Sequence, residues 1–201
     1  MRGENVLPRP GGQPTYSDLA IEAALTIRMI LRLPLRQTGG FLRSLAGLLG
    51  LGLPIPDHNT LSRRLQKLGN LRFRKLAGDE PVHLLIDSTG LRAHVGHLRK
   101  PPKRRVWRKL HLAVNAETGE VLASDLTNRR TADCARVPEL LDQIDDRVAS
   151  YSRRSLVENA VFRYKTIFGQ RMRSRFFGSQ RVEVCLACKI LGHDDQSGDA
   201  R

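Results

Sequence analysis

Four polar residues in the segment YSRRSLVENAVFRYK have types and spacing suited to chemistry on phosphate groups. Tyr151, Arg154, Glu158 and Lys165 are separated by 3, 4 and 7 positions. At roughly 100° per residue these positions share one side of a helix, so we expect a helix from about residue 151. A carboxylate between Arg and Lys suits a site where a metal-binding acid meets phosphates. The alternative is a surface helix with ion pairs between neighbouring turns.

Asp87 is a second candidate acid. It follows the apolar run from Val82 to Ile86 and precedes the small residues Ser-Thr-Gly. A carboxylate at a strand end can hold a divalent metal in a cleft. The alternative is a turn-forming Asp that caps its own backbone.

Basic residues dominate the composition, with 34 Lys and Arg against 20 Asp and Glu and a net charge of +14. This surplus favours a polyanionic partner. Between residues 91 and 110 lie eight basic residues and no acidic one, which suits a track along a phosphate backbone. We expect Trp107, within this segment, to anchor the next strand. The candidate DNA contacts here are Arg99, Lys100, Lys103, Arg104, Arg105, Arg108 and Lys109.

The N-terminal part predicts helices. Apolar spacing indicates one over residues 19–33, capped by Asp18, and another over residues 38–49. A third, basic helix follows, with Asp57 or Asn59 as its cap. A helix, a turn and a basic helix suit the DNA major groove, and the alternative is a helical hairpin with a solvated basic face. The candidate DNA contacts on the third helix are Ser62, Arg63, Arg64 and Lys67, with Leu61, Leu65 and Leu68 facing inward.

From residue 82 the pattern changes to short strands, with a hairpin turn at Thr118-Gly119, a helix over 133–144 and the helix from 151. This order predicts an α/β domain with a mixed sheet. The expected organisation is a flexible lead-in over residues 1–17, a helical DNA-binding region over 18–78, the α/β domain over 79–191 and a disordered tail over 192–201.

The sequence also excludes several classes of protein. No apolar run reaches the ~18 residues of a membrane span, so we expect no membrane partner and a cytoplasmic, nucleoid-associated protein. Three cysteines are too few for a disulfide framework. We expect Cys185 and Cys188 to pack on a helix rather than hold zinc.

The signature Tyr151-x2-Arg154-x3-Glu158-x6-Lys165 resembles in full that of bacterial insertion-sequence DDE transposases, especially the IS-five group. The string LLIDSTGL around Asp87 is similar to their first-aspartate motif. The strings WRKLHLAVNAETGEVLASDLT and ENAVFRYKTIFGQRMRSR are also similar to theirs. The resemblance extends from the N-terminal helices to about residue 190.

The resemblance implies an RNase H-like fold, with a mixed sheet and flanking helices, that uses Mg²⁺ or Mn²⁺ for in-line phosphoryl transfer. It makes Asp87 the first metal ligand and Glu158 the last. Arg154 and Lys165 would contact the cleaved strand, and Tyr151 would orient DNA. The implied partners are double-stranded DNA at terminal inverted repeats and further copies of the chain in a homo-oligomer.

The sequence departs from this pattern at the second catalytic Asp. The family places it on a strand, in a string such as ADGAYD, and no such string occurs here. An internal deletion near residues 150/151 would explain this and predicts the loss of one sheet strand. The available substitutes are Asp125, Asp133, Asp142, Asp145 and Asp146, and we expect none of them to restore the site.

These observations predict a transposase by descent that binds element-end DNA and is catalytically defective. An alternative is a DNA-binding remnant that occupies element ends and inhibits transposition. A basic RNA- or ribosome-associated protein would explain the charge but not the spacing of Tyr151, Arg154, Glu158 and Lys165.

Overall fold

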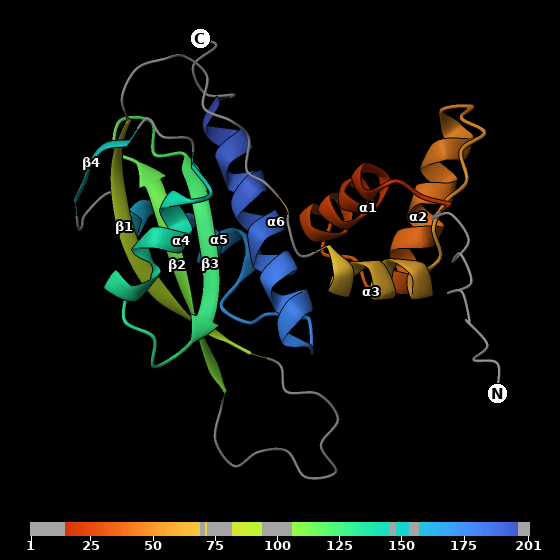
Figure 1. Ribbon diagram of the computed structural model, residues 1–201. Helices are drawn as coiled ribbons and strands as arrows, with labels where there is room; N and C mark the ends of the chain where they lie inside the picture. Colours follow the sequence, from red (N-terminus) through yellow and green to blue (C-terminus); the bar gives the residue numbers. More distant parts are fainter. Residues whose placement is uncertain are drawn as a thin grey trace, which may run out of the picture.

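The computed structural model describes residues 15–68, 71, 82–93, 106–144, 148–152 and 157–196. Figure 1 shows a sheet with helices on both faces and a group of N-terminal helices beside it. The helices are α1 (Asp18–Ile30), α2 (Leu35–Leu48), α3 (His58–Lys67), η1 (Cys134–Arg136, a 3-10 turn), α4 (Val137–Leu141), α5 (Val157–Phe168) and α6 (Phe177–Gln196). The strands are β1 (Val82–Arg92), β2 (Trp107–Asn115), β3 (Val121–Asn128) and β4 (Val148–Ser152).

The sheet has the order β3-β2-β1-β4. The first three strands are antiparallel, and β4 runs parallel to β1 on its other edge. The turn between β2 and β3 contains Gly119 at φ +74°, a left-handed conformation that glycine adopts without steric cost, and this confirms the predicted hairpin. Trp107 begins β2, as expected, and lies against Gly90 of β1.

Opposite faces of the sheet bury different helices because successive strand residues point to opposite sides. Leu85 and Leu91 of β1 belong to the main core with α5 and α6. Ile86 belongs to a smaller cluster with Leu140 of α4. The sheet is therefore covered by α5 and α6 on one face and by α4 on the other, as Figure 1 shows.

The N-terminal helices share a core with α6. Their cluster contains Ile21 and Leu25 of α1 and Leu61 of α3, together with Val182 and Leu186 of α6. Other residues of α6 belong to the core of the sheet. Helix α6 therefore lies between the two parts of the molecule and joins them (Figure 1).

Several predicted elements are confirmed, with different ends. Helix α1 is capped by Ser17 rather than Asp18, because the Ser17 hydroxyl accepts the N–H of Ala20 at 3.1 Å. Asp57 caps α3, as predicted, by accepting the N–H of Thr60 at 2.8 Å. The helix expected over 133–144 is shorter, with η1 and then α4, where Pro138 lies in the first turn.

Two further expectations differ from the structure. The connection between α2 and α3 spans residues 49–57, which is longer than the three or four residues of a helix-turn-helix. Helix α6 continues to Gln196, although residues from 192 onward were expected to form a tail. Across the described ranges, no helix combines the length and apolar character that a membrane span requires.

Candidate nucleic-acid and metal site

Asp87 lies in the middle of β1 and points to the face that α5 and α6 cover. It shares this face with Leu85 and Leu91, which pack in the main core. The neighbouring Ser88 points to the other face, where its hydroxyl is hydrogen-bonded to Asp133. Among the described residues, none forms a hydrogen bond or ion pair with the half-buried Asp87 carboxylate. Within the described part of the chain, the Asp87 carboxylate is therefore available to a ligand.

Glu158 lies in the first turn of α5, on the same side of the sheet as Asp87. The C-terminal end of α5 lies near the C-terminal end of β1, because the segment after α5 pairs with the last residue of β1. There the N–H of Arg92 donates to the carbonyl oxygen of Gln170 at 2.8 Å. Counting back from this contact, Asp87 is about 17 Å along β1, and Glu158 is about 15 Å along α5. Measured along their own elements, the two carboxylates are therefore a similar distance from this contact, and the Glu158 side chain is exposed.

The predicted stripe of four polar residues forms only in part. The prediction that Tyr151 lies on this helix is wrong. Tyr151 lies in β4 and pairs with Leu84 of β1. Arg154 lies outside the described residues. Glu158 and the half-buried Lys165 are two turns apart on α5 and share one side of that helix. The helix begins six residues later than predicted because the chain first completes a parallel strand.

The strand expected to be lost is therefore present in a short form. β4 spans the position of the predicted deletion and extends the sheet next to β1. Its sequence is VASYS, which contains no acidic residue. The sheet position that the resemblance gives to the second catalytic Asp is thus occupied by a strand that carries no carboxylate.

Asp87 and Glu158 supply the oxygen ligands that Mg²⁺ prefers. In the ranges that the structure describes, however, no three His, Cys, Asp or Glu side chains form a group that could hold a metal. Mg²⁺ commonly binds through one or two carboxylates and completes its shell with water and substrate phosphates. The residues present therefore fit an ion that is held jointly with DNA and do not fit an all-protein cage.

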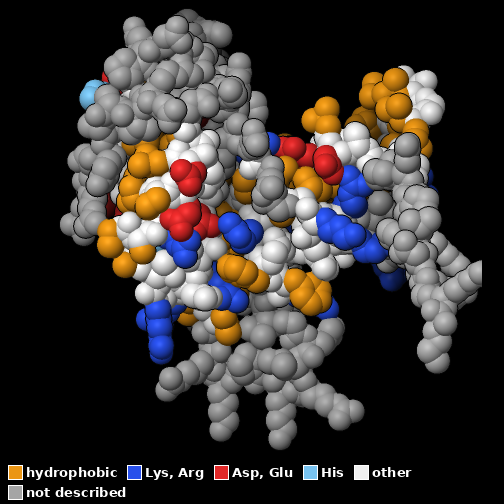
Figure 2. Space-filling model, in the orientation of Figure 1, with side chains coloured by type: hydrophobic (Ala, Val, Ile, Leu, Met, Phe, Trp, Pro, Cys, Tyr) orange, Lys and Arg blue, Asp and Glu red, His pale blue; other side chains and the backbone are white. Residues whose placement is uncertain are grey.

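The candidate substitutes that the structure describes are all held away from Asp87. Asp133 is bound to Ser88 on the opposite face of the sheet, and Asp125 is paired with Arg181 at 3.2 Å. Asp142 caps the end of α4 and is exposed. Asp145 and Asp146 lie outside the described residues. Figure 2 shows acidic and basic side chains side by side on this part of the surface. Asp125 is neutralised by Arg181 and Asp133 by Lys109.

The sequence analysis did not identify a buried polar network on the α4 face of the sheet. His111 is fully buried, with Nε2 2.8 Å from Thr127 Oγ1 and Nδ1 3.1 Å from Asp133 Oδ1. Burial lowers the pKa of His111, and the charge of Asp133 offsets this only in part. Burial raises the pKa of Asp133, but hydrogen bonds from Lys109 and Ser88 outweigh it, so the net shift is downward. The network therefore holds β2, β3 and the start of η1 together.

The predicted DNA contacts fall into three groups. Arg63 and Lys67 are exposed on α3, while Leu61, Leu65 and Leu68 are buried beneath them, as predicted. Three of the other cations are held within the chain: Arg64 by Asp18, Arg108 by Asn128 and the ring of Phe177, and Lys109 by Asp133 at 2.8 Å. Ser62 is half-buried on α3. The remaining candidates, Arg99, Lys100, Lys103, Arg104 and Arg105, lie outside the described residues.

Another group of arginines was not singled out from the sequence. Arg28, Arg32, Arg171 and Arg173 line a hollow between α1, the end of α5 and the start of α6. Two of them lie in the string QRMRSR, which was quoted only for its family resemblance. The signal that could have drawn attention to them is this local density of arginine after the Glu158 helix.

Comparison with known families agrees with this geometry. Two family models, each described as a transposase DDE domain, match residues 3–95 and 78–150. Together the matches span residues 3–150, which include the N-terminal helices and the strands from β1 through most of β4. Over these residues the chain is therefore similar to transposases with a DDE domain. Proteins of this family bind DNA and act in DNA transposition, typically with Mg²⁺.

Proposed function

We propose that the protein is an insertion-sequence transposase of the IS-five group that binds element-end DNA and is catalytically defective. The observation that carries the proposal is the pairing of β1 and β4. β1 bears Asp87 at the expected place, whereas the neighbouring β4 bears no carboxylate. Metal-dependent transfer with two ions needs acids that balance their charge, and two carboxylates do this poorly.

An internal deletion near residues 150/151 accounts for this arrangement. Two observations support it. The match to the second family model ends at residue 150, and the signature helix begins only seven residues later. β4 would then be built from sequence on both sides of the join. The deletion would remove the second Asp and leave Asp87, Glu158 and Lys165 in place.

The remaining residues would act directly on DNA. Asp87 and Glu158 would hold a cation together with a phosphate of the bound strand. The cation, when bound, would supply Lewis-acid stabilisation of charge on the phosphate oxygens. Lys165 lies on the same side of α5 as Glu158 and would contact the backbone beside this phosphate. In the described part of α3, Arg63 and Lys67 are exposed and available to the duplex.

A protein that binds element ends without cutting them would compete with an intact transposase for the same DNA. Two features favour this inhibitory role: the exposed cations of α3 and the lack of a carboxylate on β4. We propose that it acts as a homo-oligomer, as the family resemblance implies, so that one assembly engages both ends.

The test combines binding and cleavage of a labelled duplex taken from DNA that flanks the coding sequence. We expect a salt-sensitive complex and no strand cleavage in Mg²⁺ or Mn²⁺. Cleavage that disappears in Asp87→Ala would contradict the catalytic defect. A chain that is folded but binds no duplex would contradict the DNA-binding part of the proposal.

A further inference from the structure

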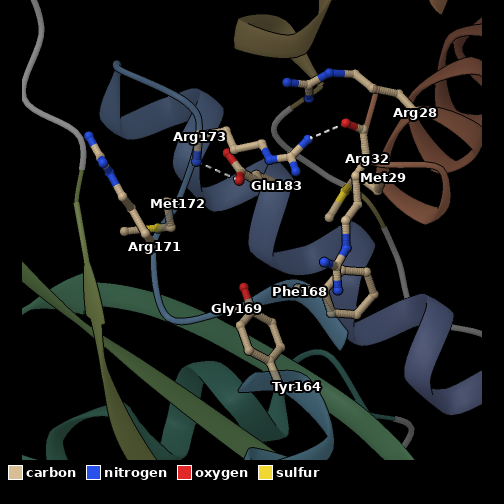
Figure 3. A pocket seen from close by; sticks show the side chains of 10 residues that line it. All are labelled: Arg28, Met29, Arg32, Tyr164, Phe168, Gly169, Arg171, Met172, Arg173 and Glu183. Carbon is tan, nitrogen blue, oxygen red and sulfur yellow. Dashed lines mark hydrogen bonds between the residues drawn. The ribbon is translucent and has the colours of Figure 1, made fainter. Parts of the chain in front are cut away.

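The arginine-lined hollow lies where the N-terminal helices meet the end of the Glu158 helix. Its enclosed volume is about 30 Å³. Figure 3 shows Arg28 and Met29 of α1, Arg32 just after α1, Tyr164 and Phe168 of α5, and Glu183 of α6 around the hollow. The loop after α5 adds Arg171, Met172 and Arg173. Four arginines and one glutamate line the hollow, so the charge around it is positive.

The single carboxylate is already engaged. Glu183 accepts the backbone N–H of Arg173 at 2.8 Å and that of Ser174 at 2.7 Å, one with each oxygen. These bonds use Glu183 to hold the loop after α5 in place. No ion pair joins Glu183 to an arginine among the described residues. Its charge therefore offsets the cations only partly.

Arg28 has the most buried cationic side chain in the described part of the chain, with 8% of its surface exposed. Its Nε is buried and has no hydrogen-bond partner. Burial lowers the pKa of this guanidinium, and the carboxylate of Glu183 raises it by a smaller amount. Buried charges are normally paired, because an unpaired one loses its hydration without compensation. Among the described residues, Arg28 therefore feels the charge of Glu183 but forms no ion pair with it.

Arg32 occupies a backbone position that usually belongs to glycine. It follows α1 at φ +53°, and the N–H of Leu33 donates to the carbonyl oxygen of Arg28 at 2.9 Å, as in a Schellman motif. A non-glycine residue in the left-handed conformation costs free energy, so contacts of this residue must offset that cost. The guanidinium reaches Ile167 O, and the carbonyl of Arg32 accepts a bond from Arg173 at 2.8 Å. Arg32 thus ties the three elements around the hollow together.

We propose that this hollow is a binding site for a phosphate group of the DNA backbone. The proposal rests on the DNA binding proposed above and deepens it. A phosphodiester would pair with Arg28 and with the guanidinium groups at the rim, because arginine matches phosphate oxygens with forked hydrogen bonds. Tyr164 directs its hydroxyl toward the same hollow (Figure 3) and would donate to a phosphate oxygen.

The position of the hollow relates this phosphate to the candidate metal site. The hollow adjoins the ends of β1 and α5, about 15 Å from Asp87 and Glu158 by the lengths of these elements. At roughly 3.4 Å per base pair, this distance corresponds to about four to five steps of a duplex. One strand could therefore contact the hollow and the carboxylates at once, and the hollow would set its register.

The test measures duplex affinity against salt for the full chain and for Arg32→Gly, Arg171→Ala and Arg28→Gln. Arg32→Gly is the most informative variant, because glycine suits its backbone conformation and keeps the fold. Arg130→Ala is the matched control, since Arg130 is exposed, does not line the hollow and carries the same charge. Thermal unfolding verifies the fold of each variant. We expect Arg32→Gly and Arg171→Ala to weaken binding about tenfold and to reduce the log–log salt slope by about 0.9.

A second arm replaces single phosphates of the duplex by neutral methylphosphonates. For the wild-type chain, a methylphosphonate about four to five nucleotides from the most sensitive site should lower the affinity. The same substitution should leave the affinity of Arg32→Gly unchanged. Folded variants with wild-type affinity, slope and profile would overturn the phosphate site while DNA binding stands. Binding of inorganic phosphate with an unchanged duplex profile would also overturn it. Failure of the wild-type chain to bind DNA would instead reject the proposed function.

Discussion

Arg64 of α3 forms an ion pair with Asp18 at the start of α1 and donates a hydrogen bond to Tyr16 O at 3.1 Å. This cation therefore holds two N-terminal helices together. The adjacent Arg63 is exposed. We therefore expect Arg64 to stabilise the fold and Arg63 to contact DNA, and substitution of each residue separates the two effects.

We predict that Arg64→Ala lowers the free energy of unfolding by about 1 kcal/mol, through loss of the ion pair and the hydrogen bond. Arg63→Ala should leave stability unchanged, weaken duplex binding and reduce the salt slope by about 1. Chemical denaturation and salt-dependent binding measure the two effects. An unchanged slope for Arg63→Ala would contradict a DNA-contacting role for α3.

The pH dependence of stability should carry a contribution from His111. Because burial lowers its pKa in the folded protein, the unfolded chain binds the proton more readily. Stability from this residue is therefore complete above the unfolded pKa of about 6.5 and falls as the pH drops through it. Denaturant titrations between pH 7.5 and 5 should show this loss. His111→Gln should reduce it, and an equal loss in the variant would contradict the assignment.

The thiols should differ in reactivity. Cys134 is exposed, whereas Cys188 is fully buried and Cys185 donates a hydrogen bond to Leu71 O at 3.5 Å. Burial raises the pKa of Cys185 to about 11 and that of Cys188 further still. A thiol reagent at pH 8 should therefore modify one cysteine per native chain and none in Cys134→Ser. Rapid labelling of Cys134→Ser would show that α6 opens from its neighbours.

Helix α6 should make the N-terminal helices and the sheet unfold together. Leu186 is buried against the N-terminal helices, while Val184 and Ala187 pack in the core of the sheet. We predict that Leu186→Ala costs about 3 kcal/mol and keeps a single unfolding transition. Near-ultraviolet circular dichroism and Trp107 fluorescence should then report the same midpoint. Separate midpoints for the two probes would contradict the shared core.

Local patterns predicted the parts of this molecule that depend on neighbouring residues. Asp57 as a cap, Leu61 and Leu65 as inward positions and Gly119 in a turn are all confirmed. The family resemblance also led to a sheet with Asp87 on its first strand. These features depend on helical or strand periodicity and on backbone conformations that a few residue types favour.

Long-range relationships were not accessible in this way. The spacing of Tyr151 and Glu158 fits a helix, but pairing with β1 places Tyr151 in a strand instead. Parallel pairing joins segments that lie far apart in the chain, so a short strand carries little signal of its own. The hollow between Arg28 and Arg173 likewise unites residues from the two ends of the sequence. Its cations became visible only once α1 was placed against the end of α5.

The most direct test of the account restores an acid to β4. Ser152 ends this strand and pairs with Leu85, two residues before Asp87. We predict that the wild-type chain binds the labelled duplex and does not cut it, whereas Ser152→Asp binds equally well and nicks it in Mg²⁺. Tyr151→Asp, one position out of register, is the matched control and should stay inactive. Mg²⁺-dependent cutting by the wild-type chain, abolished by Asp87→Ala, would contradict the claim that the missing acid on β4 disables the protein.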